Sequence, residues 1–174
     1  MRNSAQVTAH PKSTDDSPIC VALGPEHASS LALFFDRLRQ AGVEDFFHPH
    51  PLTAEEADAR SKYSGQDFYC VMIQHGNVVG YGMLRGWDDG YPIPSLGIVL
   101  DPAVTGRGYG RMLMNFLHDT ARKRGAVKVR LKVDPRNRAA IELYRSLGYV
   151  LEQQADRQLI GLLDLASTSS GKNG

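Results

Sequence analysis

Apolar residues in this chain fall into short runs that predict the strands of one sheet. The runs are rich in β-branched and aromatic residues or alternate with polar ones, and they cover residues 19–23, 68–73, 78–84, 95–100 and 127–133. The turn sequence His-Gly-Asn at 75–77 joins the second and third runs, which therefore form an antiparallel hairpin. The run 95–100 is expected to be the central strand, and a last pair of strands is predicted within 149–165.

Apolar residues at helical spacing predict helices between these strands. The clearest set recurs at intervals of three, four and seven residues and consists of Leu31, Phe34, Phe35 and Leu38. Thr53 followed by Glu56 makes a capping box at the start of a second, short helix. The apolar faces of two further helices consist of Met112, Leu113, Phe116 and Leu117, and of Ala140, Ile141 and Tyr144. This order of elements predicts an α/β fold in which helices flank a mixed, mostly antiparallel central sheet.

Length and composition indicate one folded unit. A chain of 174 residues has the length of a single domain, and the apolar periodicity is confined to residues 19–165, which we expect to form that domain. Residues 1–18 and 166–174 are polar and cannot bury enough apolar surface to offset the entropy of ordering them. We therefore expect both segments to be flexible tails.

Charge and cysteine content narrow the possible partners. Twenty Lys and Arg residues against nineteen Asp and Glu residues give a formal charge of +1, too balanced for nucleic-acid binding over the whole surface. No apolar run approaches the ~18 residues of a membrane-spanning helix, and the N-terminal segment lacks the apolar stretch of a signal peptide. Cys20 and Cys70 form no CxxC motif, which argues against a disulfide framework or a cysteine zinc site. We expect a cytoplasmic monomer or homodimer without a membrane partner.

A glycine-rich segment lies where the central strand meets a helix. Its sequence, Thr-Gly-Arg-Gly-Tyr-Gly at 105–110, places outward-pointing N–H groups at a helix start, where they and the helix dipole favour a phosphate group. It is not a dinucleotide-binding fingerprint, because Arg111 stands where the third glycine is required, and it lacks the lysine of a P-loop. Taken alone, the segment predicts either a phosphate site or only a tight connection.

Two stretches of sequence extend this motif into a family resemblance. Residues 98–114 (IVLDPAVTGRGYGRMLM) and 133–149 (VDPRNRAAIELYRSLGY) resemble the GCN5-related N-acetyltransferase family in sequence, order and separation. The resemblance implies a sheet that is split at its central strands, and acetyl-CoA as co-substrate without a metal. In that family the first stretch is the pyrophosphate loop. Gly108 and Gly110 match its pattern, whereas Thr105 stands where Arg or Gln is usual, so that Arg107 or Arg111 would have to compensate.

The resemblance also implies contacts for the rest of acetyl-CoA. Backbone groups of strand 98–100 would bond the pantetheine arm, as an added strand does. Asn137 and Tyr144, two helical turns apart, would contact that arm and the departing sulfur, with Tyr144 as the general acid. A core tyrosine and a helix-capping asparagine are the alternative interpretations. The expected acetyl-CoA site comprises Ile98, Val99, Leu100, Thr105, Gly106, Arg107, Gly108, Tyr109, Gly110, Arg111, Asn137 and Tyr144.

Fewer sequence features point to the residues that bind and deprotonate the acceptor amine. Many family members carry a glutamate base on the central strand, and this strand has none. The candidate bases are therefore Asp88, Asp89, His48 and His50. Trp87 and Tyr91 flank the two aspartates in a loop that suits stacking on an amino sugar, although a plain surface turn has the same composition. His48 and His50 are expected to line the acceptor pocket and, with no third ligand nearby, do not predict a metal.

The leading hypothesis is an enzyme that transfers an acetyl group from acetyl-CoA to a primary amine of a small molecule, with an amino sugar favoured. Direct attack of the amine in a ternary complex is the expected mechanism. The alternatives are a non-catalytic module that binds acyl-CoA, which the missing strand glutamate keeps open, and an acetyltransferase of proteins or peptides.

Overall fold

The computed structural model describes residues 16–47, 49–154 and 157–166. The tails predicted at 1–18 and 166–174 lie outside the described residues, apart from 16–18 and 166, and so does His48.

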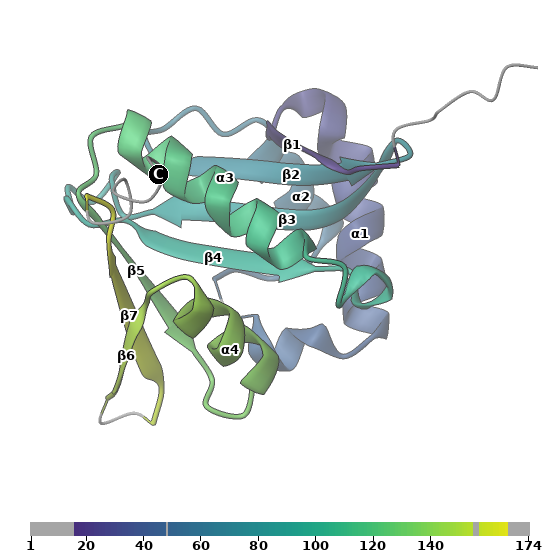
Figure 1. Cartoon of the computed structure of the whole chain (residues 1–174). Helices are drawn as coiled ribbons and strands as arrows, with labels where there is room; N and C mark the ends of the chain where they lie inside the picture. Colours follow the sequence, from purple (N-terminus) through teal and green to yellow (C-terminus); the bar gives the residue numbers. More distant parts are fainter. Residues whose placement is uncertain (1–15, 48, 155–156, 167–174) are drawn as a thin grey trace, which may run out of the picture.

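One twisted sheet runs through the molecule (Figure 1). Its strands are β1 (Ile19–Ala22), β2 (Phe68–Gln74), β3 (Asn77–Arg85), β4 (Ser95–Leu100), β5 (Lys128–Val133), β6 (Val150–Gln153) and β7 (Leu159–Asp164). They lie in the order β1-β2-β3-β4-β5-β7-β6, and every neighbouring pair is antiparallel except β4 and β5. The mixed, mostly antiparallel sheet with β4 near its centre is therefore confirmed.

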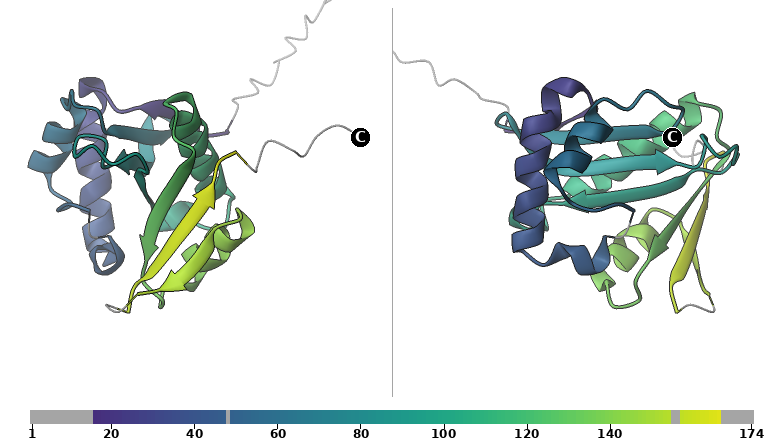
Figure 2. Two further views of the ribbon diagram at one scale, coloured as in Figure 1. Left: turned by 90° about the vertical axis from the view of Figure 1, so that its left-hand side faces the viewer. Right: turned by 180° about the vertical axis from the view of Figure 1, so that it is seen from behind.

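Helices cover both faces of this sheet (Figures 1 and 2). The helices are α1 (Ala28–Gln40), α2 (Ala54–Ser61), α3 (Tyr109–Lys123) and α4 (Arg138–Ser146), with 3-10 turns η1 (Pro25–His27), η2 (Val43–Phe46) and η3 (Pro102–Val104). We call the face covered by α1 and α2 the α1 face, and the face covered by α3 and α4 the α3 face. On the α1 face none of the helices in the described part of the chain lies over β5, β6 and β7, as the right-hand view of Figure 2 shows.

Each face has its own hydrophobic core. The residues predicted for the first helix, Leu31, Phe34, Phe35 and Leu38, are all buried on the α1 face. On the α3 face the buried residues of α3 are Leu113, Met114, Leu117, His118 and Ala121. The predicted apolar face of this helix was wrong at Met112, which is 40% exposed. Met112 lies about 100° round the helix from Leu113, on the side opposite to the buried Met114, and therefore points to solvent.

Of the two hydrogen bonds predicted for the capping box at the start of α2, only the one to the Thr53 side chain is formed. The Thr53 hydroxyl accepts a hydrogen bond from the Glu56 N–H at 3.1 Å, as a capping residue should. The Glu56 carboxylate is engaged by the Arg60 guanidinium at 2.5 Å, one turn further along the helix. The cap is therefore confirmed, while the Glu56 side chain serves an ion pair within the helix.

The sheet is split between β4 and β5. Among the described residues, these two strands pair only where Ser95, the first residue of β4, lies beside Arg130 of β5, and the Arg130 N–H donates to the Pro94 carbonyl at 3.0 Å. Beyond this point the strands diverge, as Figure 1 shows. In the part of the chain that the structure describes, no helix is both long and apolar enough to cross a lipid bilayer.

Candidate active site in the split of the sheet

A cavity of about 1360 Å³ occupies the split. Gly97 and Ile98 line it from β4, and Arg130 and Lys132 line it from β5. Both faces of the sheet contribute further residues, namely Phe46, Phe47 and Pro49 on the α1 face and Asn137 and Tyr144 on the α3 face. The cavity therefore passes through the sheet, so that two molecules can meet in it from opposite faces.

The edge of β4 that faces the split has unpaired backbone groups. The Asp101 N–H donates to the Val79 carbonyl of β3 at 2.9 Å, so alternate residues of β4, including Val99, point their backbone groups at β3. Ile98 and Leu100 belong to the other set and point theirs toward β5, which has diverged at this level. Two of the three strand residues predicted to bond a ligand thus have free backbone groups, whereas those of Val99 are directed at β3.

The glycine-rich loop 105–110 leads into the first turn of α3. Gly106 and Gly108 have φ values of 81° and 79°, a left-handed conformation that favours glycine, and a Cβ at either would meet no protein atom within 4 Å. Thr105 is exposed, and the Tyr109 hydroxyl accepts a hydrogen bond from Gln74 at 2.8 Å. No side chain of a described residue caps α3, so the N–H groups of its first turn are open to an anion.

The end of this loop also packs α3 against α4. A Cβ on Gly110 would lie 3.0 Å from Leu143 Cδ2, so only a glycine allows this close approach without adjustment. The Arg111 guanidinium donates to the Ser146 hydroxyl at 2.6 Å and is thereby tied to α4. Arg107 is exposed and forms no hydrogen bond or ion pair within the described residues, so its guanidinium group remains available to a ligand on the loop.

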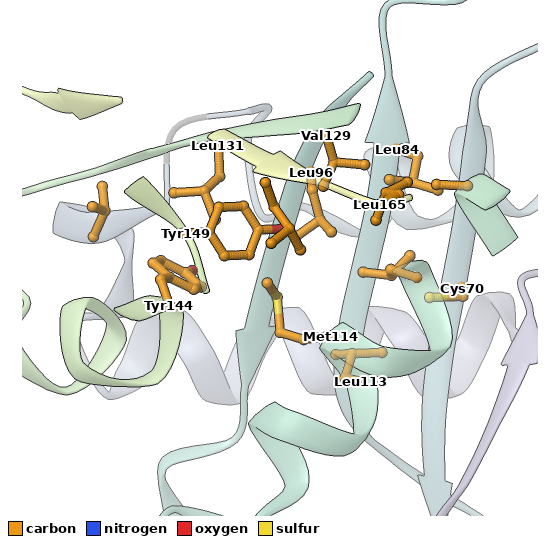
Figure 3. Close-up of a cluster of buried hydrophobic side chains, with 14 of the residues drawn as sticks. Cys70, Leu84, Leu96, Leu113, Met114, Val129, Leu131, Tyr144, Tyr149 and Leu165 are labelled. Carbon is orange, nitrogen blue, oxygen red and sulfur yellow. The ribbon is translucent and has the colours of Figure 1, made fainter. Parts of the chain in front are cut away.

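Tyr144 lines the cavity from α4 with a buried ring. The residue is 7% exposed, and its ring centroid lies 5.8 Å from that of Tyr149 (Figure 3). No described residue forms a hydrogen bond with its hydroxyl, which leaves that group available to a ligand in the cavity. Burial raises the pKa of Tyr144 to about 12. The hydroxyl therefore stays protonated over the pH range in which amines lose their proton, as a proton donor must.

A buried pair of polar residues, His118 and Tyr149, lies next to Tyr144. His118 Nε2 and the Tyr149 hydroxyl share a hydrogen bond of 2.7 Å. Burial, with a smaller contribution from Arg122, lowers the pKa of His118 to about 4, and burial also raises the pKa of Tyr149. Both groups are consequently neutral at pH 7.

Asn137 combines the two interpretations given to it. Its side-chain oxygen accepts a hydrogen bond from the Ala140 N–H at 3.2 Å and so caps α4. The residue also lines the cavity, where its amide N–H₂ group can donate to a ligand.

Two residues of loop 86–94, Trp87 and Asp88, lie away from the cavity. Trp87 packs against the core of the α3 face, with the Arg124 guanidinium 5.1 Å from its ring. Asp88 accepts hydrogen bonds from the Tyr63 hydroxyl and, at 2.8 Å, from the Gln66 N–H, and the bond from Tyr63 lowers the pKa of Asp88. Neither residue lines the cavity. The predicted roles of Trp87 in stacking on an acceptor and of Asp88 as a base do not fit these positions, because both side chains are used to hold the loop.

The second half of the same loop does reach the cavity. Asp89 and Tyr91 both line it, and Tyr91 is 63% exposed. Phe46, which is 46% exposed, lines the cavity from the end of η2. Exposed aromatic rings therefore flank the opening.

His50 supports the cavity wall without lining it. Its ring nitrogens contact the Pro51 carbonyl at 2.8 Å and the Tyr81 hydroxyl at 3.0 Å, and its ring lies 5.2 Å from that of Phe47. Burial lowers the pKa of His50. Phe47 lines the cavity and His50 does not, so the predicted contact of His50 with the acceptor stays a prediction. Within the described ranges, no group of three or more His, Cys, Asp or Glu side chains is arranged to hold a metal ion.

Several cavity residues were missed by the sequence analysis. Asp67 accepts hydrogen bonds from the N–H groups of Gly86 at 2.8 Å and Trp87 at 2.9 Å, and Arg85 donates to the Pro49 carbonyl at 2.8 Å. Asp67 and Arg85 both line the cavity, as do Arg130 and Lys132 of β5. The strict alternation of apolar and basic residues at 127–133 could have indicated these residues, because it places the basic side chains on one face of the strand. The alternation does not show that this face borders a cavity.

Comparison with known proteins agrees with this geometry. The sequence profile of the acetyltransferase (GNAT) family matches residues 35–149, more than half of the chain. A mycothiol acetyltransferase of Thermobifida fusca is 32% identical over 169 residues, a match that covers 80% of this chain and 51% of the relative. A [ribosomal protein bS18]-alanine N-acetyltransferase of Salmonella typhimurium is 48% identical over 52 residues, or 30% of this chain and 35% of that protein. This chain thus spans about half the length of the first relative and a smaller share of the second.

Solved structures share the fold at low sequence identity. The PaiA N-acetyltransferase of Thermoplasma acidophilum, crystallised in complex with coenzyme A, has a TM-score of 0.70 and 16% identity, with 85% of this chain and 99% of that chain covered. At this level of identity the similarity establishes the architecture and not the chemistry.

Proposed function

This chain belongs to the acetyltransferase (GNAT) family, and we propose that it is an acetyl-CoA-dependent N-acetyltransferase that acts on the primary amine of a small molecule. The observation that carries the proposal is the cavity through the split sheet, where the Tyr144 hydroxyl and the unpaired edge of β4 adjoin one space. An acyl donor on the α3 face and an amine on the α1 face would meet in this space. Such a ternary arrangement supplies the proximity that direct acyl transfer needs.

The proposed acetyl-CoA contacts run from the start of α3 to the middle of β4. The pyrophosphate would lie against the uncapped N–H groups of α3, where glycines at 106 and 108 permit close approach. The amides of the pantetheine arm would bond the free backbone groups of Ile98 and Leu100 in the manner of an added strand. The coenzyme A bound by the PaiA protein, which shares the fold, supports this choice of ligand.

The proposed reaction is a single displacement at the acetyl carbonyl. The amine nitrogen forms a bond to the carbonyl carbon as the bond from that carbon to sulfur breaks. Tyr144 would give its proton to the departing thiolate and recover one from solvent. The proton that the amine loses would pass, directly or through water, to Asp89, the cavity carboxylate without a hydrogen bond or ion pair to another described residue.

The acceptor would enter from the α1 face. Tyr91 and Phe46 flank the opening there and can cover the apolar face of a sugar ring, which supports the amino sugar favoured from the sequence, although Trp87 no longer contributes. The relative named for the alanine of ribosomal protein bS18 supports a peptide amino terminus as the second candidate.

Thiol release from acetyl-CoA tests the proposal. The purified chain would be mixed with acetyl-CoA and one amine at a time from a panel of amino sugars, amino acids, polyamines and peptides, with mass spectrometry of the product. We expect thiol release and a product heavier by one acetyl group for at least one small amine, and a loss of turnover in Tyr144→Phe. Tight acetyl-CoA binding without turnover on any amine would instead identify a non-catalytic module.

A further inference from the structure

A row of polar side chains crosses the floor of the cavity on the α1 face. Arg85 of β3 is the register partner of Ser95 of β4, and Ser95 is the register partner of Arg130 of β5. Register partners on neighbouring strands point to the same face, and strands lie ~4.8 Å apart, so two arginines flank one small serine at ~10 Å from each other. All three residues line the cavity.

Neither arginine has a carboxylate partner among the described residues. The arginine and lysine ion pairs of the described residues involve Arg37, Arg39, Arg60, Lys62, Arg122 and Arg136. Arg85 donates only to a backbone carbonyl, that of Pro49. The guanidinium of Arg130 has no hydrogen-bond acceptor among the described residues, and its Nε atom is buried without a partner. A buried N–H group without an acceptor is costly, which suggests that a ligand supplies one.

None of the three carboxylates that line the cavity is paired with these arginines among the described residues. Asp134 is paired with the Arg136 guanidinium at 2.7 Å, and Asp67 accepts hydrogen bonds from backbone N–H groups. Asp89 remains for the amine, as proposed above. The row of Arg85, Ser95 and Arg130 is therefore directed at a different group of the acceptor from the one that reacts.

The position of the row separates it from the proposed acetyl-CoA site. Val129 and Leu131 of β5 are buried in the core of the α3 face, so Arg130, which lies between them, points to the α1 face. No helix of residues 16–47, 49–154 or 157–166 covers β5 on that side (Figure 2). The uncapped start of α3 lies on the opposite face, and the phosphates of acetyl-CoA are accounted for there.

From this geometry we infer that the acceptor amine carries an anionic group, a carboxylate or a phosphate, which the guanidinium groups of Arg85 and Arg130 and the Ser95 hydroxyl bind. Planar guanidinium groups match the oxygens of both anions, and the small serine between them leaves room for the anion. The inference deepens the proposed function and rests on it, because the anion would place the amine of the same molecule in the split.

Matched pairs of amines test the inference. Glucosamine 6-phosphate is compared with glucosamine, and methionine with methioninamide, so that each pair differs by the presence of the anion. We expect the wild-type protein to have a higher kcat/KM for the anionic member of at least one pair, and which pair it is distinguishes phosphate from carboxylate. Arg130→Gln should reduce this preference by about 10- to 100-fold, mainly through KM, as expected for a hydrogen bond between charged groups.

Two variants complete the design. Ser95→Ala removes one neutral hydrogen bond and should reduce the preference by about 2- to 10-fold, which keeps the test valid if Arg130→Gln fails to fold. Lys128→Gln is the matched control, because Lys128 lies on the same face of β5 but does not line the cavity, and it should keep the wild-type preference.

The possible results distinguish a failure of the anion-binding inference from a failure of the proposed acetyltransferase function. Equal kcat/KM within both pairs, or a preference that survives in Arg130→Gln and Ser95→Ala, overturns the inference while leaving the acetyltransferase proposal intact. A loss of acetyl-CoA affinity in Arg130→Gln also overturns it, since the row would then hold the acyl donor. Absence of thiol release with every amine overturns the proposed function itself.

Discussion

Removal of the Tyr144 hydroxyl is the substitution whose effect can be worked out most fully. The ring of Tyr144 fills the core beside Tyr149, and Tyr144→Phe keeps this packing. Because no described residue bonds the hydroxyl, we expect the free energy of unfolding to change by less than about 1 kcal/mol. The variant should therefore fold normally and still bind acetyl-CoA, so that any loss of activity reflects the chemical step.

The size of that loss follows from the acid that replaces the phenol. Burial raises the pKa of Tyr144 to about 12, whereas water has a pKa of ~15.7. A difference of ~3.7 units with a Brønsted coefficient of about 0.5 predicts a fall in kcat of about 70-fold, within the span of about 10- to 1000-fold set by general-acid effects. Because the pKa is raised, the tyrosine stays protonated up to pH ~11, and the wild-type rate should show no decline below that pH from loss of this proton.

The assay is single-turnover thiol release with acetyl-CoA already bound, so that product release does not mask chemistry. Calorimetry with coenzyme A gives the control, an affinity equal in wild type and Tyr144→Phe. A variant that releases thiol at the wild-type rate under these conditions would show that another group protonates the thiolate.

Three further predictions concern the loop, the buried histidine and the base. Gly108→Val should weaken acetyl-CoA binding at least about tenfold in calorimetry, whereas Gly125→Val, with a similar φ of 85° and equally open surroundings, should not; equal losses would reduce the effect to backbone strain. The unfolded chain protonates His118 near pH 6.5 and the folded chain only near 4, so stability falls as pH drops through this window. Denaturant titration should show that wild type loses about 2 kcal/mol more than His118→Gln between pH 7 and 5, and equal losses would contradict the burial argument. Asp89→Asn should lower kcat/KM about tenfold or more while Asp88→Asn does not, and the reverse order would restore Asp88 as the base.

Local sequence patterns were sufficient for most of the fold. The period of the apolar residues in α1 corresponds to its buried face, and the His-Gly-Asn turn is formed by His75 and Gly76 at φ values of 50° and 75°. Both features depend on residues close in sequence. The apolar face of α3 was predicted less well, because residues on the boundary of a helical stripe are buried or exposed according to what packs against them.

The acceptor side of the site depends on contacts that no local pattern contains. Trp87 and Asp89 are two residues apart in one loop, yet Trp87 packs beneath Arg124 while Asp89 lines the cavity. Arg85 and Arg130 are brought onto one row only by strand pairing through β4. The glycine-rich loop could be predicted because its conformation and the helix that follows it are local features.

A crystal structure of the protein with acetyl-CoA tests the central claim most directly. The account predicts that the pyrophosphate oxygens accept hydrogen bonds from the N–H groups in the first turn of α3, and that the pantetheine arm bonds the backbone of Ile98 and Leu100. It also predicts that the thioester sulfur lies in the cavity within hydrogen-bond reach of the Tyr144 hydroxyl. Acetyl-CoA bound elsewhere, or with its sulfur outside the split between β4 and β5, would contradict the account.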